Sequence, residues 1–352
     1  MLHKKISQLA YLLLVFISLT ACNPSPATSQ QVPKSLNPTK LQIESQIVVK
    51  PIVSSTPISV IQNESNQVGI PESAHHESIT ELSNQTIESS EQAIFPTHRI
   101  IAYYGNPLSK KMGALGEYAP KTMINKLNKE VSIWNKADPE TPAIPALHLI
   151  ATVAQNDPGT ANKYRMIMPD DVINNVYELA KQNDALFFID LQTGHDDIRK
   201  LLPRFEWILK NPDVHLGIDP EFNLISSKAK PGTRVGTYDA SDINYVTNYL
   251  QQLTTKYNLP PKILVIHRFT KRGVTNAKKI ILRPDVQIVM NMDGWGAPEL
   301  KRGTYRNYIV PEPVQYTGFK VFYHNDTKSG DRLMTPSDIL KLDPQPLYIQ
   351  YQ

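Results

Sequence analysis

The stretch Val214-His215-Leu216-Gly217-Ile218-Asp219-Pro220-Glu221 places an apolar run directly before two carboxylates that are two residues apart. Side chains alternate along a strand, so Asp219 and Glu221 are expected to point to the same side. Strands of parallel sheets are buried on both faces and read as nearly continuous apolar runs. In an α/β barrel the catalytic groups follow such runs, at the C-terminal ends of the strands. The stretch therefore predicts a barrel strand followed by a candidate active site.

Similar apolar runs alternate with amphipathic stretches from Arg99 onward, which is typical of repeated βα units and a parallel sheet. We therefore predict an α/β fold, a TIM-like (β/α)8 barrel, in residues 96–352, which match the usual length of one such domain. An open doubly wound sheet is the alternative, but no glycine-rich dinucleotide loop follows an early strand. The expected strands are 100–104, 147–154, 186–191, 214–218, 263–266, 286–290, 320–323 and 347–349.

Helices are expected between these strands. Those that begin near Asp170, Asp239 and Thr335 carry acids, hydroxyls or proline at their first positions, where unpaired N–H groups and the positive end of the helix dipole favour them. The expected helices are 120–134, 170–182, 196–209, 241–257, 274–281, 298–305 and 336–340.

Residues 1–22 have a basic start and an apolar segment, as a secretory signal does. They end in Leu19-Thr20-Ala21-Cys22, which resembles the lipobox of bacterial lipoproteins. The resemblance implies a lipidated, palmitate-carrying Cys22 that anchors the protein to the cell membrane or outer membrane on the extracytoplasmic side. An ordinary signal peptide, in which Cys22 is only a small apolar residue, is the alternative. Cys22 is the chain's only cysteine, so no intramolecular disulfide can form.

Residues 23–95 are rich in Ser, Pro and Gln and contain no aromatic residue before Phe95. Without large apolar side chains the segment cannot offset its ordering entropy, so we predict a disordered tether. The formal net charge of the whole chain is only +4, which gives no reason to expect a nucleic-acid partner.

Polar side chains follow nearly every expected strand. Because a barrel interior is normally packed with apolar layers, we expect them at the mouth rather than in the core. Carboxylates crowded in a partly desolvated cleft push their pKa values apart. Glu221 is our candidate general acid, with Asp219 and Asp190 tuning its pKa and Asp293 holding a substrate group or stabilising positive charge. In the structural alternative, Asp219 ends a strand in a turn and Asp190 caps a helix.

Trp295 lies between Gly294 and Gly296, where neither helical nor strand periodicity explains it as a core residue. It suits a platform for stacking a sugar ring, or a lid over the barrel. His267 is open to three interpretations, namely a base, a ligand or a satisfied inner histidine. The other candidates for substrate binding, chosen for their place after a strand, are Arg268, Tyr104, Gln192, Asn291 and His324.

Gly217-Ile218-Asp219-Pro220-Glu221 is similar to the end of the acidic motif of chitinase-type (family 18) glycoside hydrolases, which are (β/α)8 barrels. The resemblance implies that Glu221 is the proton donor and that Asp219 orients an acetamido group, as substrate-assisted cleavage requires. Met290-Asn291-Met292-Asp293 resembles the sixth-strand motif, although Met292 replaces the usual tyrosine. Pro220 and the absence of the motif's upstream aspartates limit the similarity to site design.

Three segments also resemble uncharacterised bacterial lipoproteins and secreted proteins: Tyr103-Tyr104-Gly105-Asn106-Pro107, Gly113-Ala114-Leu115-Gly116-Glu117 and Gly217-Ile218-Asp219-Pro220-Glu221. This similarity covers most of residues 99–350 and implies a barrel, without an activity.

Three functions are compatible with these residues. The first is a surface-anchored glycoside-hydrolase-like enzyme that acts on an envelope or extracellular polysaccharide and needs neither a cofactor nor a metal. The second is a metal-dependent hydrolase whose divalent cation activates water, although no His-Glu-x-x-His motif supports it. Its ligands would be drawn from Asp190, Asp219, Glu221, His267 and His324. The third is a barrel without catalysis that binds glycan or organises the envelope.

Overall fold

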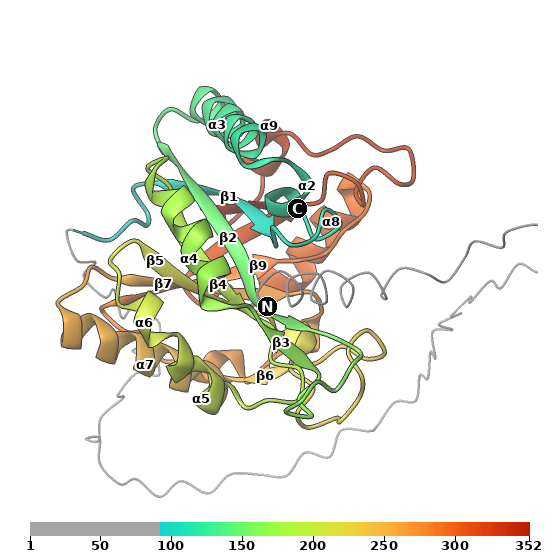
Figure 1. The fold of residues 1–352 in the computed structure, drawn as a ribbon. Helices are drawn as coiled ribbons and strands as arrows, with labels where there is room; N and C mark the ends of the chain where they lie inside the picture. The colour runs from blue at the N-terminus through green and yellow to red at the C-terminus, as the bar shows by residue number, and fades with distance from the viewer. Residues whose placement is uncertain (1–91) are drawn as a thin grey trace, which may run out of the picture. The chain divides into compact units, whose positions relative to one another are not determined.

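The computed structural model describes residues 92–352, in which eight parallel strands close into a barrel (Figure 1). The ring closes because the first strand pairs with both the second and the last strand. The TIM-like α/β class is therefore confirmed, and an open sheet is excluded. The predicted signal, Cys22 and residues 23–91 lie outside the described residues. The barrel strands are β1 (Arg99–Gly105), β2 (Ala143–Ala154), β4 (Leu186–Leu191), β5 (Val214–Ile218), β7 (Lys262–Arg268), β9 (Val286–Met292), β10 (Tyr316–Val321) and β11 (Tyr348–Tyr351).

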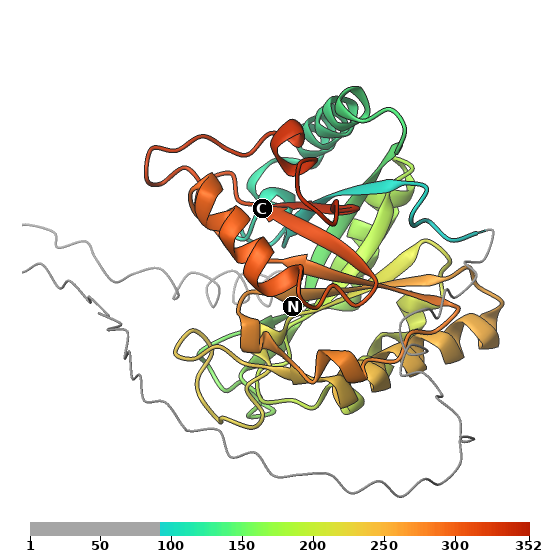
Figure 2. The ribbon, with the colours of Figure 1, turned by 180° about the vertical axis from the view of Figure 1, so that it is seen from behind.

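Helices cover the outside of the barrel, as the views from the front and from behind show (Figures 1 and 2). Capping boxes formed by Asp239 with Asp242 and by Thr335 with Asp338 begin two of them, which confirms those predicted helix starts. In the described part of the chain, no helix has both the length and the apolar character needed to cross a membrane. The helices are α2 (Ala114–Glu117), α3 (Pro120–Ala137), α4 (Asp170–Lys181), α5 (Ile198–Leu201), α6 (Glu206–Leu209), α7 (Ala240–Tyr257), α8 (Pro298–Thr304) and α9 (Pro336–Ile339).

Several predicted elements differ from the structure. The strand expected at 147–154 begins at Ala143, and the helix expected at 196–209 is divided into α5, a 3-10 turn (Leu202–Phe205) and α6. The helix expected at 274–281 is wrong: β8 (Val274–Thr275) pairs there with β6 (Tyr238–Asp239), and the left-handed backbone of Asn276, with φ of 55°, separates β8 from a single 3-10 turn. The seventh barrel strand covers Tyr316–Val321 rather than 320–323. Its first half was missed because Thr317 and Gly318 interrupt the apolar pattern there. A short strand that was not predicted, β3 (Arg165–Ile167), pairs antiparallel with the end of β2.

The N-terminal end of the barrel is closed by the chain that leads into β1. Phe95 is fully buried there, at the end of the segment predicted as a tether. The Gln287 side-chain oxygen accepts hydrogen bonds from the backbone N–H groups of Ile94 and Phe95, and its amide donates to the Phe95 carbonyl. We call Ile94 and Phe95 the plug. The barrel interior next to the plug is apolar. Its core consists of Phe95, Ile100, Ala102, Ala146, Phe188, Ile263, Val265, Val289 and Tyr348.

Candidate functional site

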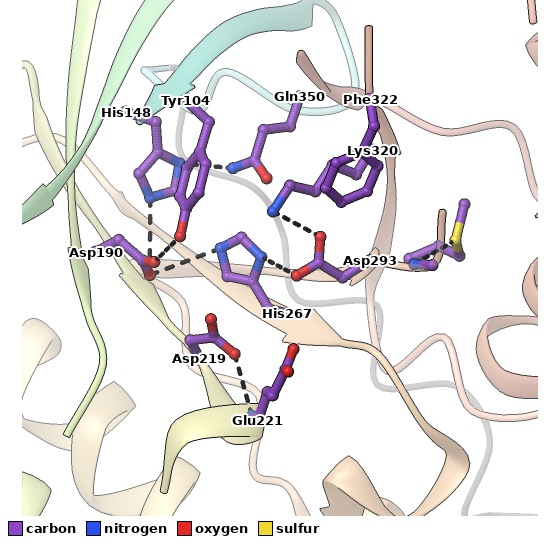
Figure 3. Close-up of polar contacts among 12 residues, drawn as sticks. Tyr104, His148, Asp190, Asp219, Glu221, His267, Asp293, Lys320, Phe322 and Gln350 are labelled. Carbon is purple, nitrogen blue, oxygen red and sulfur yellow. Dashed lines mark hydrogen bonds and ion pairs between the residues drawn. The ribbon is translucent and has the colours of Figure 1, made fainter. Parts of the chain in front are cut away.

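A layer of polar side chains crosses the barrel above the apolar core (Figure 3). Alternate strands contribute to a layer in such barrels, and here β1, β4, β7 and β10 supply Tyr104, Asp190, His267 and Lys320. The Tyr104 hydroxyl donates to Asp190 Oδ2 over 2.6 Å, and Lys320 Nζ lies 4.2 Å from the centre of the Tyr104 ring. All four side chains are buried. The expectation that Tyr104, Asp190 and His267 lie outside the core is therefore wrong, because hydrogen bonds from Tyr104 to Asp190 and between His267 and Asp293 hold them inside the barrel.

Asp293, which follows β9, joins two sides of this layer. Its Oδ2 lies 3.1 Å from His267 Nδ1, and its Oδ1 lies 2.7 Å from Lys320 Nζ. Burial alone would raise the pKa of Asp293, but Lys320 and His267 outweigh burial and hold it at about 2. Asp293 is therefore ionised at neutral pH. Burial opposes a charged His267, yet Asp190 and Asp293 raise its pKa above the usual value.

Asp219 and Glu221 lie where β5 ends, as predicted. Asp219 Oδ1 accepts the Glu221 backbone N–H over 3.1 Å and caps a 3-10 turn, Pro220–Phe222. Gln192 donates its side-chain amide to the other oxygen of Asp219 over 3.3 Å. Burial, only partly offset by His267, raises the pKa of Asp219 well above its usual range. Asp219 thus ends the strand in a turn, as the structural alternative expected, and it also lies beside Glu221.

Glu221 is the less buried member of this pair. Its pKa is raised to about 7, first by burial and then by the negative charge of Asp293, while Lys320 and His267 oppose the rise. Figure 3 shows the carboxylates of Asp219 and Glu221 on the same side of His267. The arrangement therefore combines an ionised carboxylate, Asp293, with a carboxyl group, Glu221, that exchanges its proton near neutral pH.

Three predicted site residues lie away from this cluster. Arg268 follows His267 on β7, so its side chain points to the other side of the strand and reaches Glu312 Oε2 at 2.5 Å. His324 is exposed and forms an ion pair with Glu117 over 3.0 Å. The structure thus does not bring His324 to the carboxylates. Trp295 lies on the loop after β9 with 49% of its surface exposed, and Lys328 Nζ is 5.9 Å from its ring centre.

Asn291 and His148 belong to the barrel interior as well. Asn291 is fully buried on β9, and neither atom of its side-chain amide has a hydrogen-bond partner within the described chain. His148 on β2 is also fully buried, and its Nε2 lies 3.9 Å from Asp190 Oδ1. His148 and Lys320 were not predicted as site residues. The available signal for each was a basic residue inside an expected strand, on β2 among apolar neighbours and on β10 near Thr317 and Gly318.

Gly217, within the stretch that first indicated the site, makes room for the centre. A Cβ atom at this position would lie 2.5 Å from His148 Nε2 and 2.6 Å from Asp190 Oδ1. Both distances are too short for a carbon atom beside a fixed polar group. Glycine at this strand position therefore allows His148 and Asp190 to approach each other above β5.

The fold and the buried centre define this protein as a TIM-like barrel with ionisable side chains in its interior. No family model matches the sequence, and no curated protein matches it. Among solved structures, a sugar phosphate isomerase/epimerase from Parabacteroides distasonis ATCC 8503 is similar to this chain. Its TM-score is 0.35 and its sequence identity 11%, over 72% of this chain and 86% of that chain. The barrel class rests on the strand pairing described above.

Proposed function

We propose that this protein is a glycoside-hydrolase-like enzyme that cleaves an envelope or extracellular polysaccharide by carboxylate acid–base chemistry, with Glu221 as the general acid. The observation that carries the proposal is the place of Glu221, partly buried at the C-terminal end of β5 and close to the charge of Asp293. A pKa of about 7 lets Glu221 hold a proton for the leaving group and release it within one catalytic cycle.

The neighbours of Glu221 have complementary roles in this proposal. Asp219 fixes the start of the Glu221 turn by accepting its backbone N–H. The similarity to the family 18 motif supports Asp219 as the helper that orients a sugar substituent. Asp293 stays ionised through its ion pair with Lys320, so it can stabilise the positive charge that develops on the sugar ring during cleavage.

The proposed glycan substrate is supported by Trp295. Its indole is about half exposed, and the next residue is fixed because Gly296 N–H donates to Asp326 Oδ1 over 2.8 Å. An exposed ring on an anchored loop suits stacking against a sugar face. We also propose that lipidation of Cys22 holds the enzyme at the extracytoplasmic side of a membrane, where such polysaccharides occur.

Reducing-end release from a panel of envelope and extracellular polysaccharides tests this function, with the full chain compared with Glu221→Gln. The variant keeps the shape of the side chain but has no proton to donate, so its rate should fall by a factor of about 100 or more. The wild-type rate should fall as the pH rises through about 7, where Glu221 loses its proton.

Glu178→Gln is the matched control, because Glu178 lies on α4 with an exposed side chain paired to Lys181. This control should keep the wild-type rate. A Glu221→Gln variant that also kept the wild-type rate would refute the role of Glu221. A folded wild type that released no reducing ends from any glycan would instead favour a barrel that binds without cleaving.

A further inference from the structure

Three buried polar atoms face one another in the centre of the barrel without hydrogen-bond partners among the described residues. They are His148 Nε2, Asp190 Oδ1 and His267 Nε2. The Asp190 oxygen lies 3.9 Å from the His148 nitrogen and 3.6 Å from the His267 nitrogen, and all three atoms lie within 4.8 Å of one another. An unpaired buried polar group costs free energy, so three that converge on one point require an explanation.

The other polar atom of each side chain is held. Asp190 Oδ2 accepts the Tyr104 hydroxyl, and His267 Nδ1 lies 3.1 Å from Asp293 Oδ2. Because the ionised Asp293 can only accept, His267 Nδ1 must be the donor. In neutral His267 the lone pair of Nε2 therefore points at the carboxylate oxygen of Asp190. This contact is repulsive in the neutral form, and either a proton on Nε2 or a metal cation between the two atoms relieves it.

His148 is held in the same way. Its Nδ1 lies 2.6 Å from the Tyr348 hydroxyl and 3.1 Å from the side-chain amide of Gln350. As placed, the Gln350 amide donates to His148 Nδ1 and to the Tyr348 hydroxyl, which leaves the proton of neutral His148 on Nε2. Ligation of a metal by Nε2 requires a half-turn of this amide, which brings its oxygen, unpartnered among the described residues, to His148. Nδ1 then carries the proton, and the lone pair of Nε2 faces the centre.

We propose that His148, Asp190 and His267 bind one divalent transition-metal ion of the zinc type in the barrel centre. Two imidazole nitrogens and one carboxylate oxygen are ligands that such ions prefer, and hydrogen bonds to the outer atoms of ligands are typical of metal sites. Ligand atoms about 2.1 Å from a tetrahedral ion lie roughly 3.4 Å apart, so the Asp190 oxygen needs to approach each histidine nitrogen by only a few tenths of an ångström. The two histidine nitrogens, which lie within 4.8 Å of each other, must close by more than this if they start near that limit.

Gly217 is an independent observation in favour of this site, because a Cβ atom there would occupy the space beside two of the three ligands. Three protein ligands also leave one coordination position open, as in catalytic rather than structural zinc sites. The ligand set differs from the one expected from the sequence. It gains His148, whereas Asp219, Glu221 and His324 are not part of it.

The test is a titration of the full chain, purified in detergent and stripped with a chelator, with Co²⁺ as the probe. Visible absorption should reveal one equivalent of bound Co²⁺, which Zn²⁺ displaces. His148→Gln and Asp190→Asn each remove a ligand and should weaken binding by more than about 100-fold. Tyr348→Phe removes only a hydrogen bond to a ligand and should weaken binding by about 10-fold while the site remains.

His215→Gln is the matched control. His215 is a buried histidine of β5 whose Nε2 also lacks a partner among the described residues, but it lies outside the three-ligand set. It should keep one equivalent and the wild-type affinity. A folded, stripped wild type that binds no Co²⁺ would overturn the proposal, as would equal losses in His215→Gln and His148→Gln.

If the two ligand variants do not fold, Tyr348→Phe decides, because unchanged affinity there would refute ligation by His148. The readout is binding, so it does not depend on glycan cleavage. Metal binding without turnover would leave this inference standing while the proposed function failed.

Discussion

Glu221 illustrates, at the scale of one residue, how a candidate catalytic group can reduce stability. Its pKa rises from 4.5 to about 7 on folding. Between these values the folded protein keeps a proton that the unfolded chain has released. The free energy of unfolding therefore falls as the pH rises through this window, by about 3 kcal/mol in all.

Glu221→Gln removes this titration. The variant should be more stable than the wild type at pH 8, by up to about 3 kcal/mol, and the difference should shrink toward zero as the pH falls to 4.5. Urea unfolding at several pH values measures it. Two stability curves that stay parallel across the window would show that Glu221 is not buried as described.

Gly217 allows a second test at the scale of one residue. Gly217→Ala should reduce the free energy of unfolding by about 1–3 kcal/mol, because the new methyl group collides with His148 and Asp190. Gly303→Ala is the control, since a Cβ atom at this position in α8 would meet nothing within 4 Å. That change should be neutral or stabilise by about 0.5–1 kcal/mol. Equal effects of the two substitutions in urea unfolding would contradict the close approach above Gly217.

At the scale of elements, a buried ion pair fixes the loop that carries Trp295. Lys301 on α8 donates from Nζ to Asp326 Oδ2 and to the Lys320 carbonyl, each over 2.6 Å. Asp326 in turn accepts the backbone N–H groups of Gly296 and Phe322. One carboxylate thus connects α8, the loop after β9 and the end of β10.

Lys301→Met should lower the free energy of unfolding by about 3–5 kcal/mol, because it leaves the Asp326 charge buried and unpaired. Arg302→Met on the same helix removes a contact to Glu299, whose side chain is 75% exposed, and a 3.5 Å contact to Asp338, which keeps its pair with Arg332. It should cost less than about 1 kcal/mol. Chemical denaturation of both variants measures the difference. Similar losses would mean that the buried pair contributes no more than the exposed one.

The elements also show how far the sequence could predict the site. Apolar runs located all eight barrel strands, and the carboxylates follow β5 as expected. They lie at the start of a 3-10 turn rather than on the strand, so strand alternation does not set their directions. When both faces of a strand are buried, an apolar run in the sequence does not show which of its side chains point into the barrel. Lys320 and His148 were missed for this reason. The layer that joins Tyr104 to Asp190 depends on the stagger of the closed barrel, which is set by all eight strands together.

At the scale of the whole molecule, the two ends of the barrel have different chemistry. Phe95 and the apolar core fill the N-terminal end, whereas the ionisable groups of the candidate site lie toward the C-terminal ends of the strands. The plug should therefore contribute to stability without tuning the site. Phe95→Ala is expected to lower the free energy of unfolding by about 3–5 kcal/mol, because it leaves a cavity beneath the core.

The same variant should leave the pH at which Glu221 titrates unchanged, which the pH dependence of unfolding reports. Leu108→Ala is the control, because its side chain is 42% exposed, and it should change stability by no more than about 0.5 kcal/mol. If Phe95→Ala cost no more than Leu108→Ala, the chain before β1 would not be part of the folded barrel. If it shifted the Glu221 titration as well, the apolar core would not separate the plug from the site.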